Sequence, residues 1–351
     1  MTLRDQIDVI NRRWRLARRP EGTVRREDFI LDETPLAPPL GQGKLLLRHE
    51  LLLCAPTIRN WISGRRESYY PTIEIGDPIL APAASRILFS DDPAWPVGAL
   101  VVGLGTWQDY EWVSPEGRGL RVIPDGISSR AAMGLFGMNA LTAYFGVIAV
   151  GRARKGETLL VSGAAGSVGA MAAQFGRILG CRVVGLCGSV EKARWLREDC
   201  GITSVIDYVR EDVPDRLAAL CPDGVDVVFD NVGGEFLHQA LARTNRHGRI
   251  VLCGQIATYD VADPDAGRPL DMMRIIYGSI TLSGFLLNDF STDIPDAQKK
   301  IAEWAKQGLL AHREDLRDGF DSLPETFMAL FNGGNQGTLL GRIADKQGRA
   351  L

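Results

Sequence analysis

The sequence predicts a two-domain α/β protein in which a strand-rich domain is joined to a doubly wound parallel sheet. Its 351 residues correspond to about two domains at roughly 150 residues each. Short β-type runs dominate before about residue 130, whereas strands alternate with helices from about 131 to 257. Hydrophobic residues make up 45% and charged residues 24%, which is typical of a globular protein and excludes disordered, collagen-like and disulfide-stapled classes.

The first part contains β-type runs separated by Gly, Pro and Asp turns, and helical periodicity is nearly absent there. Strands at this spacing indicate a partly closed barrel or a sandwich. The predicted strands are residues 44–54, 78–89, 99–104, 107–113 and 120–123.

The middle part begins with a short apolar strand at 158–162 and a helix at 167–179, whose apolar residues recur at helical spacing. Strand and helix then alternate, which predicts a parallel sheet with helices on both faces. The continuing series is a strand at 182–187, a helix at 191–200, and strands at 204–208, 225–230 and 249–253. The tail adds a strand at 280–286, a helix at 294–306, a strand near 313–320, a helix from Leu323 and a strand at 338–343 that rejoins the first domain.

Charge and cysteine content narrow the function classes. Forty basic and 43 acidic residues give a net charge of −3, so no basic surplus exists to bind nucleic acid. We expect no membrane-spanning segment, because no apolar run approaches the ~20 residues that cross a bilayer. The six cysteines form no C-x-x-C pair, and the charged N-terminus lacks an apolar signal core, so we expect reduced thiols and a cytoplasmic location.

A glycine turn follows the strand at 158–162 and opens the next helix. It reads G-A-A-G-S-V-G, with glycine at 163, 166 and 169. Glycine permits a tight turn and a close approach to pyrophosphate, and the helix N-terminus faces the anion. We therefore expect Gly163, Gly166, Ser167, Val168 and Gly169 to bind a dinucleotide; the alternative is close helix–strand packing.

The end of the next strand distinguishes the two nicotinamide dinucleotides. An NAD site carries an acid there, about 20 residues after the first glycine, but this strand ends in Cys187, Gly188 and Ser189. Lys192 follows one turn into the helix, and Tyr208 ends the third strand. A small corner with a lysine predicts NADP, although Glu191 argues against it and Lys192 taken alone could be a solvated surface residue.

A metal site is not expected. Zinc needs three or four converging ligands, whereas the four histidines are scattered and no cluster of cysteines exists. A nicotinamide enzyme without metal must polarise its substrate with hydrogen-bond donors.

Four segments occur in a recognisable order: GMNALTAYFG (137–146), VSGAAGSVG (161–169), DNVGG (230–234) and CGQIATY (253–259). Together they resemble the zinc-independent medium-chain dehydrogenase/reductases, in the branch of leukotriene B4 dehydrogenase/prostaglandin reductase and curcumin reductase. The resemblance implies a GroES-like barrel domain at 1–130 and 310–351, an inserted Rossmann domain at 131–309, and a homodimer. It also implies NADPH-dependent reduction of the C=C bond of α,β-unsaturated ketones or aldehydes. The alternatives are a quinone oxidoreductase and an NADPH-binding sensor without turnover.

The resemblance also implies roles for individual residues. Asn231 matches an asparagine near the cofactor, but it could simply begin a turn. Phe285 matches a contact on the nicotinamide side, but it could be ordinary core. The other matched cofactor residues are Cys253, Gly254, Gln255, Ile256, Leu286, Leu287 and Asn335.

Tyr259 is the candidate catalytic residue, because the matching tyrosine of the family lies near the nicotinamide. A phenol has a pKa near 10, so at neutral pH it can donate to a developing oxyanion or deliver a proton. The alternative is that Tyr259 only packs on the cofactor.

One segment departs from the family pattern. Members commonly read D-P-Y-M-R where this chain reads A-P-T-I-R at 55–59, so the tyrosine is lost. Trp61, Tyr69, Tyr70 and Trp107 are candidates to line the substrate pocket, with equal expectation that they form barrel core.

Overall fold

The computed structural model describes residues 9–37, 44–64, 72–260 and 269–343. The chain divides into two compact units. The first unit comprises Met1–Met133, Asp315–Asn335 and Leu339–Leu351, and the second comprises Gly134–Glu314 and Gln336–Thr338. These borders lie three to five residues beyond those expected from the sequence, and the short segment at 336–338 joins the second unit.

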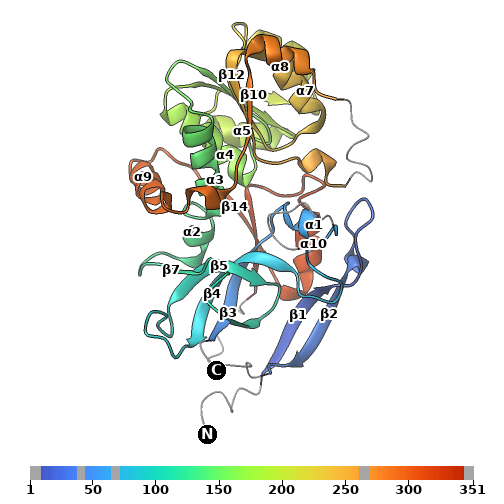
Figure 1. Cartoon of the computed structure of the whole chain (residues 1–351), viewed down its shortest axis with the longest axis vertical. Coiled ribbons are helices and arrows are strands. Elements are labelled where there is room, and N and C mark those ends of the chain that lie inside the picture. Colours follow the sequence, from blue (N-terminus) through green and yellow to red (C-terminus); the bar gives the residue numbers. More distant parts are fainter. Residues whose placement is uncertain (1–8, 38–43, 65–71, 261–268, 344–351) are drawn as a thin grey trace. The chain divides into compact units, whose positions relative to one another are not determined.

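The second unit is built on a six-stranded parallel sheet in the order β10-β9-β8-β11-β12-β13 (Figure 1). Its strands are β8 (Thr158–Val161), β9 (Arg182–Cys187), β10 (Ser204–Asp207), β11 (Val225–Asp230), β12 (Thr244–Leu252) and β13 (Thr281–Gly284). The helices are α3 (Met138–Phe145), α4 (Ser167–Ile178), α5 (Val190–Glu198), α6 (Val213–Leu220), α7 (Gly234–Arg243), α8 (Met272–Gly278) and α9 (Ile294–Lys306).

Both faces of this sheet are covered, because successive side chains of a strand point to opposite faces. In β8, Leu159 and Val161 belong to one core, which includes Phe175 of α4, while Leu160 belongs to a second core with Leu237 of α7. The strands therefore read as continuous apolar runs, as expected for a parallel sheet with two buried faces. The doubly wound fold predicted from the sequence is confirmed.

The first unit contains a seven-stranded sheet in the order β14-β15-β3-β4-β5-β7, with β6 paired to β3. Its strands are β3 (Leu45–Leu53), β4 (Leu80–Phe89), β5 (Leu100–Thr106), β6 (Tyr110–Val113), β7 (Arg121–Val122), β14 (Glu314–Asp318) and β15 (Thr338–Arg342). A separate antiparallel ribbon consists of β1 (Ile10–Leu16) and β2 (Phe29–Pro35). The helices are α1 (Ile58–Trp61), α2 (Ser129–Met133) and α10 (Leu323–Met328).

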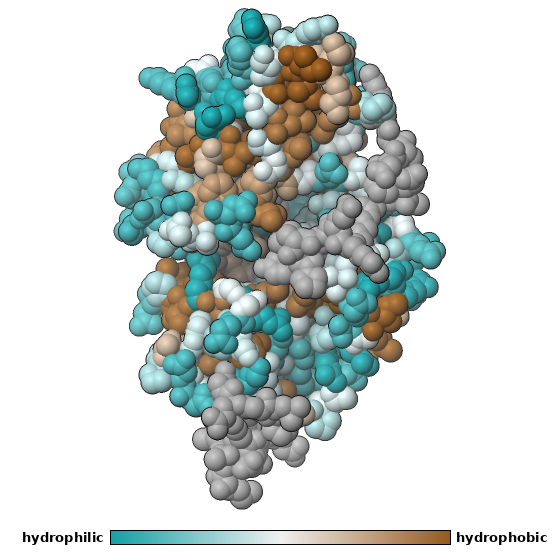
Figure 2. Space-filling model, viewed as in Figure 1, coloured by the Kyte–Doolittle hydropathy of each residue, from teal (hydrophilic) through white to brown (hydrophobic). Residues whose placement is uncertain are grey.

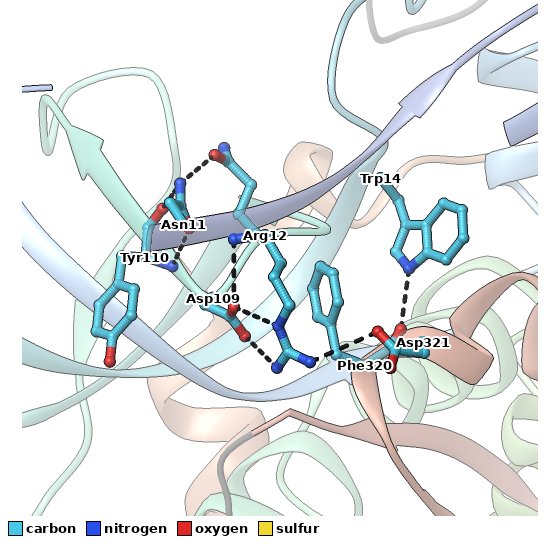
Figure 3. A network of polar contacts seen from close by, with 8 residues as sticks. Asn11, Arg12, Trp14, Asp109, Tyr110, Phe320 and Asp321 are labelled. Atoms are coloured by element: carbon cyan, nitrogen blue, oxygen red, sulfur yellow. Dashed lines mark hydrogen bonds and ion pairs between the residues drawn. The ribbon is translucent and has the colours of Figure 1, made fainter. Parts of the chain in front are cut away.

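The ribbon was not predicted, and its formation explains why the strand expected at 107–113 is shorter. Trp107 instead accepts a hydrogen bond from the Trp14 amide at 2.9 Å. In Figure 3, the Arg12 guanidinium donates to both carboxylate oxygens of Asp109, at 2.8 and 3.0 Å, and the Trp14 indole donates to the Phe320 carbonyl. The segment before β6 therefore pairs with the ribbon rather than extending the strand.

One apolar stretch, Ser129–Val150, is long and apolar enough to cross a membrane by length and composition. The expectation that no apolar run approaches this length was therefore wrong. The stretch consists of α2, a turn at 134–137, α3 and a π-helical turn (Gly146–Val150). Leu141 and Phe145 are buried in the core of the second unit, so packing accounts for much of its hydrophobicity.

Candidate functional site

The expected cofactor residues of the second unit follow the carboxyl ends of its six parallel strands, which meet at one edge of the sheet. This edge is where ligands bind in doubly wound folds. In strand order, the residues are Gly163 to Gly169 after β8, Gly188 and Ser189 after β9, Tyr208 after β10, Asn231 after β11, Cys253 to Tyr259 after β12, and Phe285 to Leu287 after β13.

The glycines after β8 are required by the geometry of the turn. Gly163 has φ of 56°, a conformation that side chains disfavour. Its carbonyl oxygen accepts the Gly166 amide at 2.9 Å and would lie 2.2 Å from a Cβ atom at Gly169. A side chain at Gly169 therefore cannot fit unless the turn moves. This packing leaves a cradle of bare backbone in front of α4.

The N-terminus of α4 has the properties of an anion site. Gly166 is its N-cap residue and supplies no side-chain cap. The amides of Ser167, Val168 and Gly169 form the first turn, whose N–H groups have no partner within the helix. Together with the helix dipole, this turn fits a pyrophosphate group.

The ends of β9 and β10 form a second corner. A Cβ atom at Gly188 would lie 2.5 Å from the Tyr208 hydroxyl, so only a glycine at this position leaves room for the tyrosine ring. The Ser189 hydroxyl caps α5 by accepting the Lys192 amide at 3.2 Å. Burial lowers the pKa of the half-buried Lys192, and the positive charge of Arg313 acts in the same direction. The corner places the Tyr208 phenol beside the bare backbone of Gly188, and Lys192 follows in the first turn of α5.

Two acids, Glu191 and Asp207, lie near this corner. Glu191 is exposed at the start of α5, where its own amide and the Ser189 hydroxyl hold its pKa below the usual value. Asp207 is buried at the end of β10 and accepts from the Val209 amide at 3.1 Å and from Arg210 at 2.8 Å. Neither arrangement reproduces the acid at the end of β9 that an NAD site uses.

A buried network that the sequence did not indicate joins β8 to β11. The Ser162 hydroxyl donates to Asp230 at 2.7 Å, and Asp230 also accepts from the amides of Val232 and Gly233. Burial raises the pKa of Asp230, although these hydrogen bonds oppose the shift. Asn231 donates from its side chain to the Ser162 carbonyl at 2.7 Å. The network fixes the turn at 230–234, so Asn231 has a structural role whether or not it also contacts a cofactor.

The loop after β12 packs onto that turn. The amides of Cys253 and Gly254 donate to the Asp230 carbonyl at 2.8 and 3.1 Å, and the Ala257 amide donates to the Val232 carbonyl at 3.1 Å. Tyr259 ends a 3₁₀ helix, η4 (Ile256–Thr258). Its hydroxyl would lie 3.7 Å from a Cβ atom at Gly254, so the ring folds back toward the start of the loop. Tyr259 is thus brought close to Gly254, at the ends of β11 and β12.

The last expected contacts lie at the end of β13 and near the C-terminus. Phe285 packs against the core and approaches Gly146, whose Cβ would lie 2.9 Å from its ring; Leu286 is partly exposed. Asn335 directly precedes the segment in which Gly337 forms a parallel bridge with Gly166.

The structure describes two of the four residues that were candidates to line the substrate pocket. Trp61 and Trp107 are 2% and 0% exposed and belong to the hydrophobic core of the first unit. Their burial supports the core alternative, whereas Tyr69 and Tyr70 lie outside the described residues. In the departing segment at 55–59, Arg59 is buried and donates to the Gly22 carbonyl at 2.9 Å.

Cys253 is the thiol in the loop after β12, and its protonation state follows from its burial. Burial raises the pKa of Cys253 to about 12, so the thiol stays protonated at neutral pH. Among the described residues, no group of three or more His, Cys, Asp or Glu side chains is placed to hold a metal ion.

Comparisons with known proteins match nearly the whole chain. A family model for zinc-binding dehydrogenases matches residues 167–303, and one for the N-terminal domain of oxidoreductases matches residues 12–122. The NADPH-dependent curcumin reductase of Escherichia coli (strain K12) is 36% identical, over 95% of this chain and 97% of that protein. The NADP(+)-dependent 2-alkenal reductase of Nicotiana tabacum is 32% identical, over 86% and 88%. The crystal structure of CurA in complex with NADPH from Vibrio vulnificus is 30% identical with a TM-score of 0.90, covering 95% of this chain and 99% of that chain.

Proposed function

Because this chain belongs to the zinc-independent medium-chain dehydrogenase/reductases, in the branch of double-bond reductases, we propose that it uses NADPH to reduce the C=C bond of α,β-unsaturated ketones and aldehydes. The observation that carries this proposal is the edge of the parallel sheet. There, an uncapped helix N-terminus behind a glycine cradle lies in the same unit as a Lys192–Tyr208 corner without the acid of an NAD site.

The residues at this edge fit the parts of NADPH. The α4 N-terminus would hold the pyrophosphate, while Lys192 and Tyr208 would hold the 2′-phosphate by charge and hydrogen bonding. The loop from Cys253 to Ile256, the residues Phe285 to Leu287 and Asn231 would surround the nicotinamide end. When bound, NADPH supplies the hydride that is added to the β-carbon of the substrate.

Tyr259 is the residue that we assign to the substrate carbonyl. As the β-carbon gains a hydride, negative charge develops on the carbonyl oxygen, and the α-carbon then takes a proton. A protonated phenol can donate to this oxygen. The proximity of Tyr259 to Gly254 supports the role, because it keeps the hydroxyl at the carboxyl edge of the sheet.

The test is to follow NADPH oxidation with enals, enones, 1,4-benzoquinones and alcohols in parallel. We expect turnover with enals and enones, and mass spectrometry should show a product with a saturated C=C bond and an intact carbonyl. Preference for quinones would instead identify a quinone oxidoreductase. Tight NADPH binding with no oxidation by any compound would identify a nucleotide sensor.

We further propose that two copies associate through the edge of the second unit formed by β13 and α8. β13 is the last strand of the sheet, and an edge strand offers unpaired backbone groups. The neighbouring α8 exposes Met272, Met273, Ile276 and Tyr277, and an apolar patch over this helix is visible near the top of Figure 2. An exposed patch of this kind is typical of a protein interface.

The cytoplasm is the compartment that we propose for the enzyme. All six cysteines are free thiols, which is the state that reducing compartments maintain. Fractionation of the source cells with an antibody against the chain tests this location, and recovery with the membrane or secreted fraction would contradict it.

A further inference from the structure

We propose that Asn139 is a positioning residue that orients the Ser167 hydroxyl as a hydrogen-bond donor to the cofactor pyrophosphate. This inference rests on the proposed dinucleotide site, and it adds a residue from outside the glycine turn. Asn139 acts through Ser167.

The contact joins the first turns of two helices. Asn139 is the second residue of α3, and Ser167 is the first residue of α4. The Asn139 side-chain Nδ2 donates to the Ser167 Oγ at 2.9 Å, and both side chains are partly buried. The N-terminus of α3, like that of α4, has no side-chain cap. Two helix N-termini, each with partial positive charge, therefore lie beside the Ser167 hydroxyl.

The direction of this hydrogen bond determines whether the Ser167 hydroxyl can donate its hydrogen to a ligand. A serine hydroxyl has one hydrogen and two lone pairs, and its rotation is ordinarily free. Because one lone pair accepts from Asn139, the hydrogen of Ser167 is left to be donated to another group. An anion at the α4 N-terminus is the acceptor that the surrounding charge favours.

The neutral amide suits this position. An amide donates to Ser167 without placing a negative charge near the phosphate. An aspartate of the same shape would accept from the hydroxyl instead, turning its hydrogen away, and would repel the anion. The effect of Asn139 should therefore depend on the hydroxyl of Ser167 and on the phosphate groups that NADPH and NADH share.

The test is a double-mutant cycle of Asn139→Ala and Ser167→Ala, read by titration of three nucleotides. Asn139→Ala should weaken the binding of NADPH and of NADH by the same factor, roughly three- to tenfold. The substitution should leave the affinity for 2′-AMP unchanged, because that nucleotide lacks the pyrophosphate. In the Ser167→Ala background the same substitution should have no further effect. The kcat at saturating NADPH should also stay unchanged.

Gln298→Ala is the matched control. Gln298 Nε2 donates to the Phe136 carbonyl at 3.3 Å, so this substitution also removes an amide contact to the segment before α3, but it does not touch Ser167. It should alter none of the three affinities. Additive losses in the cycle, or an equal loss of 2′-AMP affinity, would show that Asn139 only supports the fold and would overturn the inference. Unchanged dinucleotide affinity in Asn139→Ala overturns this inference alone, whereas a wild-type protein that binds neither dinucleotide overturns the proposed function with it.

Discussion

Removal of the Lys192 side chain should weaken the binding of NADPH but not the binding of NADH. In Lys192→Ala the start of α5 should persist, because Ser189 caps the backbone amide of this residue and not its side chain. A hydrogen bond from a charged group contributes about 1.5–3 kcal/mol. Lys192 is only half-buried, so solvent screens the contact, and we expect a value near the lower limit, which is about a tenfold rise in the Kd for NADPH.

The assay is a fluorescence titration of wild type and variant with NADPH and NADH. The Kd for NADH should hardly change, because NADH lacks the 2′-phosphate. Arg194→Ala is the control, since it removes the same charge from an exposed position on the same helix. Equal losses with both dinucleotides would show a structural role for Lys192. A loss in Arg194→Ala as large as in Lys192→Ala would show a general effect of charge instead of a specific contact.

The pH dependence gives a second measurement of the same contact. Burial lowers the pKa of Lys192 below 10.5, and the charged form that binds phosphate exists below that pKa. The preference for NADPH over NADH should therefore be strongest below the lowered pKa and should decline as the pH rises through it. Lys192→Ala should show no such decline.

Four other perturbations test the remaining conclusions. Tyr259→Phe should lower kcat about a hundredfold, because one oxyanion donor contributes about 3 kcal/mol; a fall of less than about threefold at saturating enone would assign the donor elsewhere. Gly169→Ala places a Cβ atom 2.2 Å from the Gly163 carbonyl oxygen, so affinity for both dinucleotides should fall at least about tenfold in titrations. Unchanged affinity would refute the role of the glycine turn. Activity should survive prolonged EDTA treatment, and elemental analysis should find well under one zinc per chain; stoichiometric zinc lost together with activity would contradict the metal-free mechanism. Ile276→Glu introduces charge into the exposed patch on α8 and should convert dimer to monomer in analytical ultracentrifugation, whereas the exposed Val97→Glu should not; a dimer that persists in Ile276→Glu excludes this interface.

Local signals were sufficient for the strands and the glycine turn of the second unit. The apolar runs of β9 and β11 predict both strands with their observed bounds, Arg182–Cys187 and Val225–Asp230, because strands buried on both faces carry few polar residues. The spacing of glycine at 163, 166 and 169 also predicts the turn, since the constraint acts over seven consecutive residues. The order of the strands then brings the expected cofactor residues to one edge.

Contacts between residues far apart in the chain could not be inferred in the same way. The ribbon of β1 and β2 was not predicted, because charged residues interrupt the apolar pattern of both segments. Arg12 is neutralised by Asp109, which lies 97 residues away. The sequence likewise could not decide between core and pocket for Trp61 and Trp107, because a large aromatic side chain suits both places equally well.

The sequence by itself determined the alternation of strands and helices and the glycine turn, because both depend on patterns within single strand–turn–helix segments. Only the tertiary structure revealed the bond between Asn139 and Ser167, the Ser162–Asp230 network and the burial of the two tryptophans. These features join side chains from different elements. Their formation depends on how helices and strands pack, and a hydrogen bond needs its atoms within about 3 Å, which no local pattern specifies.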